Sequence, residues 1–354
     1  MKNILISTGG SGGHVVPATV IYDHLKSKFN IFMTCDHRGI KYLDRNKYNT
    51  EIINVPKLSK NYLLLLKIFL LPGIILRSFF FLKNKKIEIL ISTGGYMSLP
   101  LCIAARILNI KLFLFEPNMI LGRSNKLFIS ICAKIFCYSS MIKNFPISLK
   151  NKISVVPALL RKEFYSKEKA KDINQKINLL IIGGSQGAKS FDSIINDSII
   201  KLSNRYELKV FQQTNLNNFE NLKKFYLKHN IENEIFDFSE DISNFMTKTN
   251  ICITRAGAST LAELVHLNVP HVAIPLLTAK DNHQFENASF YERSGCSWII
   301  NQNEINNINL AEKLISIIDN KDQYLNKKKN MKNFSCQNTW NGINQKIINI
   351  INEN

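Results

Sequence analysis

The chain has 354 residues, of which 45% are hydrophobic and 21% charged, which excludes a disordered protein and leaves room for two globular domains. Its 46 Lys and Arg outweigh its 27 Asp and Glu, giving a formal net charge of +19. Such a charge favours anionic partners, but the sequence contains no zinc-finger or RNA-binding signature, so we expect no nucleic-acid partner.

Short apolar runs typical of buried strands alternate with helical patterns through the first half of the chain. Strands are expected at residues 3–7, 30–35, 50–55, 87–93, 111–116, 134–140 and 152–157. Helices are expected between them, for example around 17–28 and 98–108. This alternation predicts a parallel sheet with helices on both faces.

The first strand ends in a glycine-rich loop, Gly9 to Gly13, followed by His14. The glycine spacing fits neither the dinucleotide-binding pattern nor a P-loop. Glycines let a ligand approach the backbone closely, and a helix starting near Val16 and Pro17 would direct its first N–H groups at the loop. We therefore expect the loop to bind an anionic group beside His14. The alternative is a tight turn with a surface histidine.

A strongly apolar segment follows at residues 61–86, long enough to cross a bilayer. Lys67, Pro72-Gly73 and Arg77 interrupt it, and a cation at a helix centre opposes insertion. Lysines flank the segment at both ends. We expect a helix or a broken helix pair with one face on an anionic membrane surface. The alternative is an ordinary buried helix.

The pattern restarts after a Lys-rich stretch at 161–176, with strands expected from 177 and at 207–214, 234–240, 251–257 and 271–276. Its opening repeats the first one: a strand, then Gly-Gly-Ser-Gln-Gly, then a helix. Two such halves, joined near 158–172, predict an α/β protein with two doubly wound, Rossmann-like domains facing a cleft. The tail, 309–354, is expected to be helical.

The seven cysteines include no C-x-x-C pair and lie mostly in apolar runs, which indicates reduced core residues of a cytosolic protein. The N-terminus leads straight into the first strand, so no signal peptide is expected.

Polar residues at further strand ends form candidate sites. The stretch 92–100 carries Tyr96 and Ser98, and Glu116 and Asn118 follow another strand. Helix starts at 185 and 258–260 suit phosphate groups, and Glu263, one turn further on, suits two ribose hydroxyls. Polar residues suited to the hydroxyls of a sugar are Asp281, Asn282, His283, Gln284 and Asn287. Since no D-x-D motif occurs, we expect no metal and no cofactor.

Six motifs occur in order between about residues 4 and 295: GGSGGHVVPA, TGGYMSLP, EPN…G…N, GGSQGA, TRAGASTLAEL and DNHQFENA. This series resembles that of the MurG family. The resemblance implies a GT-B fold and an inverting transfer of GlcNAc from UDP-GlcNAc to the C4 hydroxyl of MurNAc in lipid I, the undecaprenyl-diphosphate-linked MurNAc-pentapeptide. The product would be lipid II, used in peptidoglycan synthesis.

The resemblance also implies a domain division and a location. Residues 1–160 would form the acceptor and membrane-associating domain, and 161–335 the UDP-sugar-binding domain. Residues 336–354 would form a C-terminal helix packing back on the first domain. The protein would lie peripherally on the cytoplasmic face of the bacterial inner membrane, and a cell-wall or division complex is a further expected partner.

Site residues carry over by motif. His14 would be the base or would position the acceptor, and Ser11, Gly12 and Gly13 would lie near the diphosphate. The remaining substrate-binding residues would be Asn118 and Gln284 on the sugar, Arg161 on the donor, Ser185 on phosphate, Ser239 on the base, and Ala258, Ser259, Thr260, Leu261, Ala262 and Glu263 on diphosphate and ribose.

The chain departs from the family pattern at several positions. Phe115 and Pro117 replace the usual His and Gln around Glu116, and Ala158 and Leu159 replace Asn-Pro. Ser11 stands for the usual Thr and His283 for Gln. These departures leave open a catalytically weakened UDP-sugar-binding scaffold. Another GT-B enzyme, such as a diacylglycerol glucosyltransferase or a nucleotide-sugar epimerase, is the second alternative.

Overall fold

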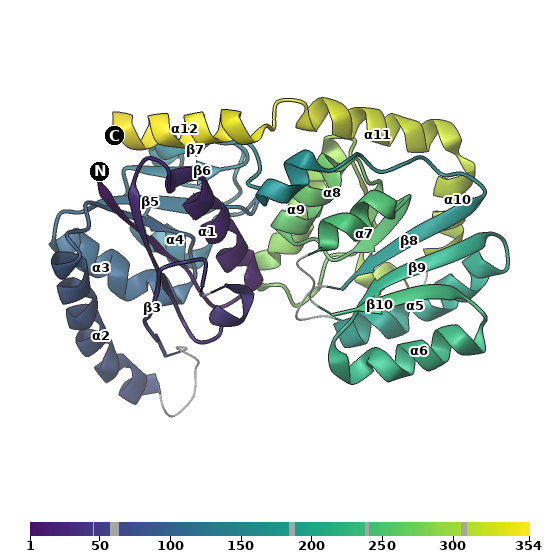
Figure 1. Cartoon of the computed structure of the whole chain (residues 1–354), viewed down its shortest axis with the longest axis horizontal. Coiled ribbons are helices and arrows are strands. Elements are labelled where there is room, and N and C mark those ends of the chain that lie inside the picture. Colours follow the sequence, from purple (N-terminus) through teal and green to yellow (C-terminus); the bar gives the residue numbers. More distant parts are fainter. Residues whose placement is uncertain (45, 57–63, 184–187, 238–240, 306–309) are drawn as a thin grey trace. The chain divides into compact units, whose positions relative to one another are not determined.

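The computed structural model describes residues 1–44, 46–56, 64–183, 188–237, 241–305 and 310–354. The chain divides into two compact units, shown in Figure 1. Unit 1 comprises Met1–Arg161 together with Thr339–Asn354, and unit 2 comprises Lys162–Asn338.

Unit 1 is built on a parallel sheet whose described strands lie in the order β3-β2-β1-β4-β5-β6-β7. These strands are β1 (Asn3–Ser7), β2 (Asn30–Cys35), β3 (Thr50–Ile52), β4 (Ile89–Ser92), β5 (Lys111–Glu116), β6 (Lys134–Cys137) and β7 (Ile153–Val155). The helices are α1 (Gly12–Leu25), α2 (Leu64–Asn84), α3 (Leu99–Ile107), α4 (Arg123–Phe128) and α12 (Trp340–Glu353). Strand residues such as Leu5, Leu90 and Phe113 are fully buried, because helices cover a parallel sheet on both faces.

Unit 2 repeats this plan with the described strand order β10-β9-β8-β11-β12-β13, again parallel throughout. Its strands are β8 (Lys176–Ile182), β9 (Glu207–Gln213), β10 (Glu232–Phe236), β11 (Ile251–Thr254), β12 (His271–Ala273) and β13 (Trp298–Ile299). Its helices are α5 (Ala188–Ser203), α6 (Phe219–Lys228), α7 (Ile242–Lys248), α8 (Ala258–His266), α9 (His283–Arg293), α10 (Leu310–Asp319) and α11 (Lys321–Ser335).

Both sheets have one point where the chain reverses its direction of travel across the sheet. In unit 1 the chain moves outward from β1 through β2 to β3, then restarts at β4 on the other side of β1. In unit 2 the same reversal lies between β8 and β11. Loops leaving neighbouring strands part at such a point, and the crevice at the carboxyl ends of the strands is where open α/β sheets bind ligands.

The expected α/β architecture and most strand positions are therefore correct, but several boundaries differ. Helix α1 begins at Gly12, earlier than Val16, because the N–H groups of His14 and Val15 already bond to the carbonyl of Ser11. The expected strand at 271–276 ends at Ala273, and the two-residue strand β13 was not expected, since so short a run carries no periodicity.

The end of the chain packs on unit 1. Helix α12 presents Ile343, Ile347 and Ile351 as one buried stripe, since residues four apart share a helix face. Trp340, in its first turn, stacks on the imidazole of His24 in α1, with ring centroids 3.7 Å apart.

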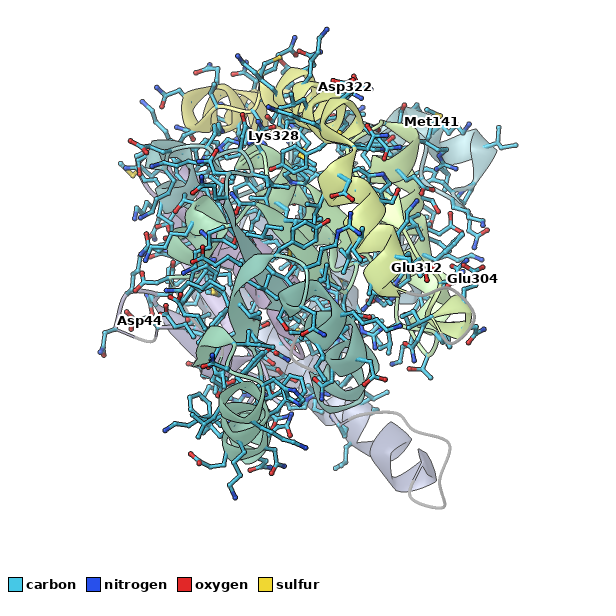
Figure 2. The ribbon with its side chains drawn as sticks, turned by 90° about the vertical axis from the view of Figure 1, so that its right-hand side faces the viewer. Asp44, Met141, Glu304, Glu312, Asp322 and Lys328 are labelled. Atoms are coloured by element: carbon cyan, nitrogen blue, oxygen red, sulfur yellow. The ribbon has the colours of Figure 1, made fainter. Side chains whose placement is uncertain are left out.

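The preceding helix, α11, is fastened within unit 2. Lys328, labelled in Figure 2, is buried, and its Nζ donates to the carbonyl of Ala170 at 2.7 Å and to Asp172 Oδ1 at 2.5 Å. This contact ties α11 to the start of unit 2, because a buried ammonium needs several acceptors.

The apolar segment at 61–86 forms the single helix α2 over its described part, with Pro72 inside it. Ser78 and Leu82 are buried, whereas Leu70, Leu76 and Phe80 expose 59%, 57% and 51% of their surface. The alternative of an ordinary buried helix is therefore wrong for residues 70–84. None of the helices in the described ranges is sufficiently long and apolar to span a bilayer.

Six of the seven cysteines are buried free thiols, in agreement with the sequence analysis, and burial raises the pKa of Cys102 to about 12. Cys336 is exposed instead, because it lies at the end of α11, outside either core.

Three buried histidines make the stability of the fold depend on pH. Burial lowers the pKa of His24, His266 and His271 from 6.5 to about 4, so each stays neutral in the folded state above about pH 4. The unfolded chain binds protons on these groups below pH 6.5, so their contribution to stability is present above that pH and is lost as the pH falls toward 4.

We predict that replacing His24 by Leu makes the free energy of unfolding less dependent on pH. Neither ring nitrogen of His24 has a hydrogen-bond partner among the described residues, so the change removes the titration without breaking such a bond. At pH 5 the wild-type residue costs about 2 kcal/mol relative to pH 7.5, and the variant lacks this cost. Urea unfolding at both pH values measures the difference, and parallel pH profiles for the two proteins would contradict the prediction.

Candidate active site

The candidate site of unit 1 lies at its reversal point, between the loops that follow β1 and β4. The hydroxyl of Thr93 donates to the hydroxyl of Thr8 at 2.9 Å, and both residues are buried. This bond clamps the two loops together. Gly10, with φ +83°, and Gly95, with φ +81°, adopt backbone conformations that favour glycine and turn the chain beside the clamp.

His14 lies in the first turn of α1 and is oriented by the β4 loop. Its Nδ1 donates to the carbonyl of Thr93 at 2.7 Å, which selects the tautomer with the lone pair on Nε2. Gly94 and Gly95 lie against the ring: a Cβ on either would contact imidazole carbons at 3.5 Å. The β4 loop therefore fixes both the plane and the tautomer of this histidine.

Ser11, Gly12 and Gly13 occupy the start of the same helix. Ser11 is the N-cap residue, with an extended backbone and no side-chain capping bond, and the first turn of α1 contains no acidic residue. The first N–H groups of a helix have no partner within it, so Gly12 and Gly13 present donors to an anion.

The loop after β5 joins this cluster through a buried carboxylate. Glu116 Oε1 accepts from the backbone N and the Nδ2 of Asn118 at 3.2 and 2.9 Å. Its Oε2 accepts from Gly122 N at 2.8 Å and from Asn125 Nδ2 at 3.0 Å. Ser124, in the first turn of α4, donates to the carbonyl of Gly95 at 2.8 Å. A network of described contacts thus links Asn118 to His14 across three strand ends.

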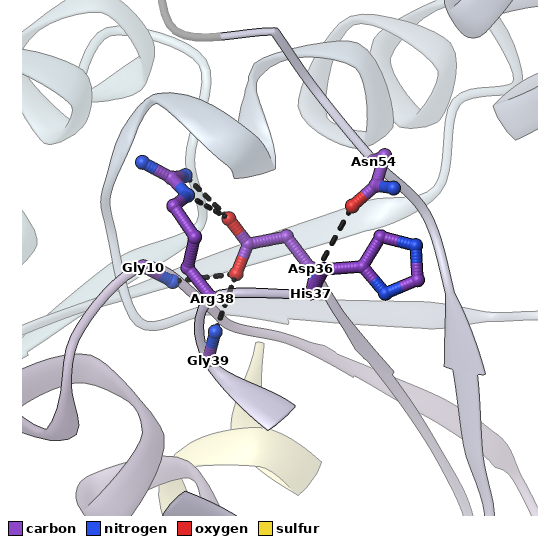
Figure 3. Close-up of polar contacts among 6 residues, drawn as sticks. All are labelled: Gly10, Asp36, His37, Arg38, Gly39 and Asn54. Atoms are coloured by element: carbon purple, nitrogen blue, oxygen red, sulfur yellow. Dashed lines mark hydrogen bonds and ion pairs between the residues drawn. The ribbon is translucent and has the colours of Figure 1, made fainter. Parts of the chain in front are cut away.

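The loop after β2 also contacts the first glycine loop, and the sequence analysis did not identify it as part of the candidate site. Figure 3 shows Asp36, at the end of β2, accepting from the backbone N–H of Gly10 at 2.7 Å and of Gly39 at 2.9 Å, and pairing with Arg38. The backbone N–H of the next residue, His37, donates to Asn54 Oδ1 at 3.0 Å. An Asp directly after a strand, three residues before a Gly, was the available signal.

In unit 2 the candidate site lies at the start of α8, beside the end of β11. Gly257 caps the helix without a side-chain bond, no acidic residue occupies the first turn, and Ala258, Ser259 and Thr260 are partly exposed. Leu261, Ala262 and Glu263 are buried one turn further on. The alternative of an exposed helix carboxylate is therefore wrong for Glu263.

The loops after β11 and β12 are both bonded to side chains of α9. Asn287 Nδ2 donates to the carbonyl of Ala256 at 3.2 Å, and Gln284 Oε1 accepts from Leu276 N at 2.9 Å. The ring of His283 donates to the carbonyl of Lys280 at 2.8 Å, a local bond within its own turn.

Arg255, which the sequence analysis left without a role, donates to the carbonyl of Ile274 and to Gln302 Oε1, and burial lowers its pKa to about 10. It therefore remains a cation below that pH, beside the start of α8.

Three predicted site residues are not among the contacts described above. Ser185 and Ser239 lie outside the described residues. Arg161 is half-buried at the end of unit 1, after buried Leu159 and Leu160. Over the part of the chain that the structure describes, no group of three or more His, Cys, Asp or Glu side chains is arranged to hold a metal ion.

Two family models match the chain, one in each half. Residues 4–137 match the glycosyltransferase family 28 N-terminal domain, and residues 178–340 match its C-terminal domain. A curated relative from Pelagibacter ubique (strain HTCC1062) is 60% identical over 354 residues, covering 100% of this chain and 99% of its own. It is named UDP-N-acetylglucosamine--N-acetylmuramyl-(pentapeptide) pyrophosphoryl-undecaprenol N-acetylglucosamine transferase. The chain belongs to the MurG family.

Two further comparisons agree. A transferase of the same name from Rickettsia bellii (strain RML369-C) is 32% identical, covering 94% of this chain and 95% of its own. The crystal structure of Acinetobacter baumannii MurG superimposes with a TM-score of 0.75 at 21% identity, covering 100% of both chains. The expectation of a GT-B fold from the MurG resemblance is confirmed.

We predict that Glu116→Gln destabilises unit 1 by about 2 kcal/mol. The NH2 group of Gln replaces one carboxylate oxygen, and because it cannot accept hydrogen bonds, it leaves the N–H donors on that side unpaired. Urea unfolding measures the loss. Glu51→Gln is the matched control: Glu51 is exposed and paired with exposed Arg77, so its loss is expected to stay within about 0.5 kcal/mol. Equal effects of the two substitutions would contradict an organising role for Glu116.

Proposed function

We propose that this chain is an inverting glycosyltransferase that moves GlcNAc from UDP-GlcNAc to the C4 hydroxyl of MurNAc in lipid I, forming lipid II for peptidoglycan synthesis. The observation that carries the proposal is the 60% identity, along the whole chain, to a transferase named for this reaction. Two structural features support it: the hydrogen-bonded loops around His14 in unit 1, and the start of α8 in unit 2, which has no acidic residue in its first turn.

In this proposal His14 is the catalytic base. The C4 oxygen of the acceptor forms the new bond to the anomeric carbon as the bond from that carbon to the diphosphate oxygen of UDP breaks. The hydroxyl proton passes to Nε2 of His14, the nitrogen that the Thr93 contact leaves with the lone pair. Attack in line with the departing diphosphate inverts the anomeric configuration.

The nucleotide sugar is assigned to unit 2. The N–H groups of Ala258, Ser259 and Thr260 point out of the start of α8, where the helix dipole stabilises the charge that grows on the leaving diphosphate. Glu263 is proposed to accept the ribose hydroxyls. Gln284, whose Oε1 holds Leu276, directs its remaining amide donors to the GlcNAc hydroxyls. Because these dipoles supply the charge stabilisation, the proposed transfer needs no metal.

The roles of Arg161, Ser185 and Ser239 on the donor, and of Asn118 on the sugar, remain proposals from the family motifs. The alternative of a catalytically weakened scaffold has no comparable support. A scaffold needs no catalytic base, yet the Thr93 carbonyl holds His14 in the tautomer that a base requires.

We predict that His14→Ala lowers kcat for transfer of labelled GlcNAc to a lipid I analogue by about 10²–10⁴-fold, since a positioned base contributes that much. UDP binding is expected to persist, because the proposed contacts of α8 with the diphosphate and ribose lie in unit 2 and do not involve His14, and wild-type transfer is expected to continue in EDTA. His229→Ala, on unit 2 after α6, is the control. Transfer by His14→Ala at the wild-type rate would overturn the role of His14, and loss of wild-type transfer in EDTA would overturn the metal-free reaction.

We also propose that the exposed faces of α2 and α3 place the protein peripherally on the cytoplasmic face of the inner membrane. Exposed apolar side chains on these helices are Leu70, Leu76, Phe80, Ile103 and Ile107. Exposed Lys83, Lys85 and Lys86 follow them at the end of α2. Apolar side chains at the headgroup boundary with flanking cations are typical of interfacial helices. A cell-wall or division complex as a further partner remains a prediction of the family resemblance.

We predict that the double substitution Leu76→Glu and Phe80→Glu weakens binding to vesicles containing anionic lipid by at least about tenfold. Each substitution removes apolar area that the membrane would bury and adds a negative charge that anionic lipid repels. Vesicle co-sedimentation measures the binding. Transfer to a water-soluble acceptor is expected to be unchanged, and Leu227→Glu, at an exposed leucine of α6 in unit 2, is the control. Unchanged sedimentation of the double variant would remove α2 as the membrane contact.

A further inference from the structure

The loop after β2 carries a pair of charges that the proposed reaction does not yet use. Asp36 exposes only 2% of its surface, and each of its oxygens accepts hydrogen bonds. Oδ1 takes the N–H groups of Gly10 and Gly39, and Oδ2 takes Nε of Arg38 at 2.9 Å together with Nη2 of the same side chain. A buried carboxylate is stable only when paired in this way, so Asp36 joins the first glycine loop to Arg38.

The loops around Asp36 are packed closely against each other. A Cβ on Gly9 would lie 2.6 Å from Asp36 Oδ1, and one on Gly39 would lie 2.6 Å from Cys35 Sγ and 2.8 Å from the Cα of Gly9. The two loops are therefore in direct backbone contact, and Asp36 holds them in that contact.

Arg38 keeps donors that Asp36 does not use. A guanidinium has five N–H donors on its edges, and the fork on Asp36 occupies only one edge. Figure 3 shows the third guanidinium nitrogen turned away from the carboxylate. One face of the group lies over the ring of Tyr96, with Cζ 4.7 Å from the ring centroid. The side chain is nevertheless 43% exposed, so a cation held on two sides still offers donors outward.

The guanidinium of Arg38 lies beside the first glycine loop, with Nη2, which also donates to Asp36, nearest to Gly10. A Cβ on Gly10 would lie 4.0 Å from Arg38 Nη2. Tyr96 directly follows Gly95, which packs on the ring of His14, so Arg38 and His14 border the same loops. A cation beside a helix start without acidic residues suits a multiply charged anion.

We propose that Arg38 is a substrate-binding residue that contacts the diphosphate of a substrate at the first glycine loop, and that Asp36 is the residue that positions it. This inference rests on the proposed function, in which UDP-GlcNAc and lipid I each carry one diphosphate. If Arg38 only neutralised Asp36, its loss would change stability and leave the affinity for diphosphate unaltered.

The test compares Arg38→Met and Arg38→Lys with wild type. The measurements are kcat, KM for each substrate separately, inhibition by inorganic pyrophosphate, and the urea midpoint. Arg38→Met is expected to raise one KM and the inhibition constant of pyrophosphate by about 10–100-fold, the effect of one lost charge-assisted bond, with kcat altered less. Arg38→Lys is expected to fall between, since it keeps the charge and loses the fork.

The two KM values identify the source of the diphosphate. A rise for the lipid I analogue alone assigns the acceptor, and a rise for UDP-GlcNAc alone assigns the donor. Arg205→Met is the matched control, because Arg205 forms a similar but exposed pair with Asp319 in unit 2. If both KM values and pyrophosphate inhibition stay within about twofold of wild type, the proposal is wrong.

Arg38→Met leaves the Asp36 carboxylate short of a partner, so the double variant Asp36→Asn with Arg38→Met separates binding from folding. Recovery of wild-type KM in the folded double variant would overturn the proposal, and a KM that stays raised supports it. If wild type makes no lipid II, the proposed function has failed instead. Calorimetric binding of pyrophosphate to wild type and Arg38→Met then still decides the role of Arg38.

Discussion

The buried carboxylate of Asp36 is the contact on which the candidate site of unit 1 depends. A glycine-rich loop has little preference for one conformation, because glycine loses more backbone freedom on ordering than any other residue. Asp36 offsets that cost by fixing the N–H of Gly10 from outside the loop. Glu116 does the same for the loop after β5 through Gly122 and Asn118. In both cases an acid at the end of a buried strand fixes a loop that carries candidate ligand contacts.

The acids act on loops, while the helix starts are kept free of them. The first turns of α1 and α8 contain no acidic residue, although Asp36 lies near one of these helices and Glu263 one turn inside the other. A carboxylate in either first turn would take the N–H donors for itself and compete with a phosphate group. The distribution of acids therefore both orders the loops and keeps the helix starts receptive to anions. The net charge of +19 is compatible with this arrangement but does not specify it.

The sequence predicted those features that depend on local pattern. The runs at 3–7, 30–35 and 111–116 form strands with the expected bounds, because continuous apolar stretches of this length suit a sheet buried on both faces. Six ordered motifs identified the family, which the 60% identical relative confirms. The position of Asp36 directly after a strand was visible in the sequence, but its role was not, because its partner Gly10 lies 26 residues away and only the strand order brings the two together. The start of α1 was misplaced for a different reason: Gly12 and Gly13 are poor helix formers, yet the extended backbone of Ser11 starts the helix before them.

The departures from the family pattern can now be assessed by what surrounds them. Phe115 is fully buried, and its ring packs edge-on against Tyr138 with centroids 5.7 Å apart, so its side chain belongs to the core of unit 1. Its carbonyl accepts from Asn125 Nδ2, a backbone contact that does not require a particular side chain at this position. Glu116 keeps its hydrogen bonds to Asn118, Gly122 and Asn125 with Pro117 in between. Phe115 and Pro117 are therefore compatible with the polar framework around Glu116, and these two departures do not favour the scaffold alternative.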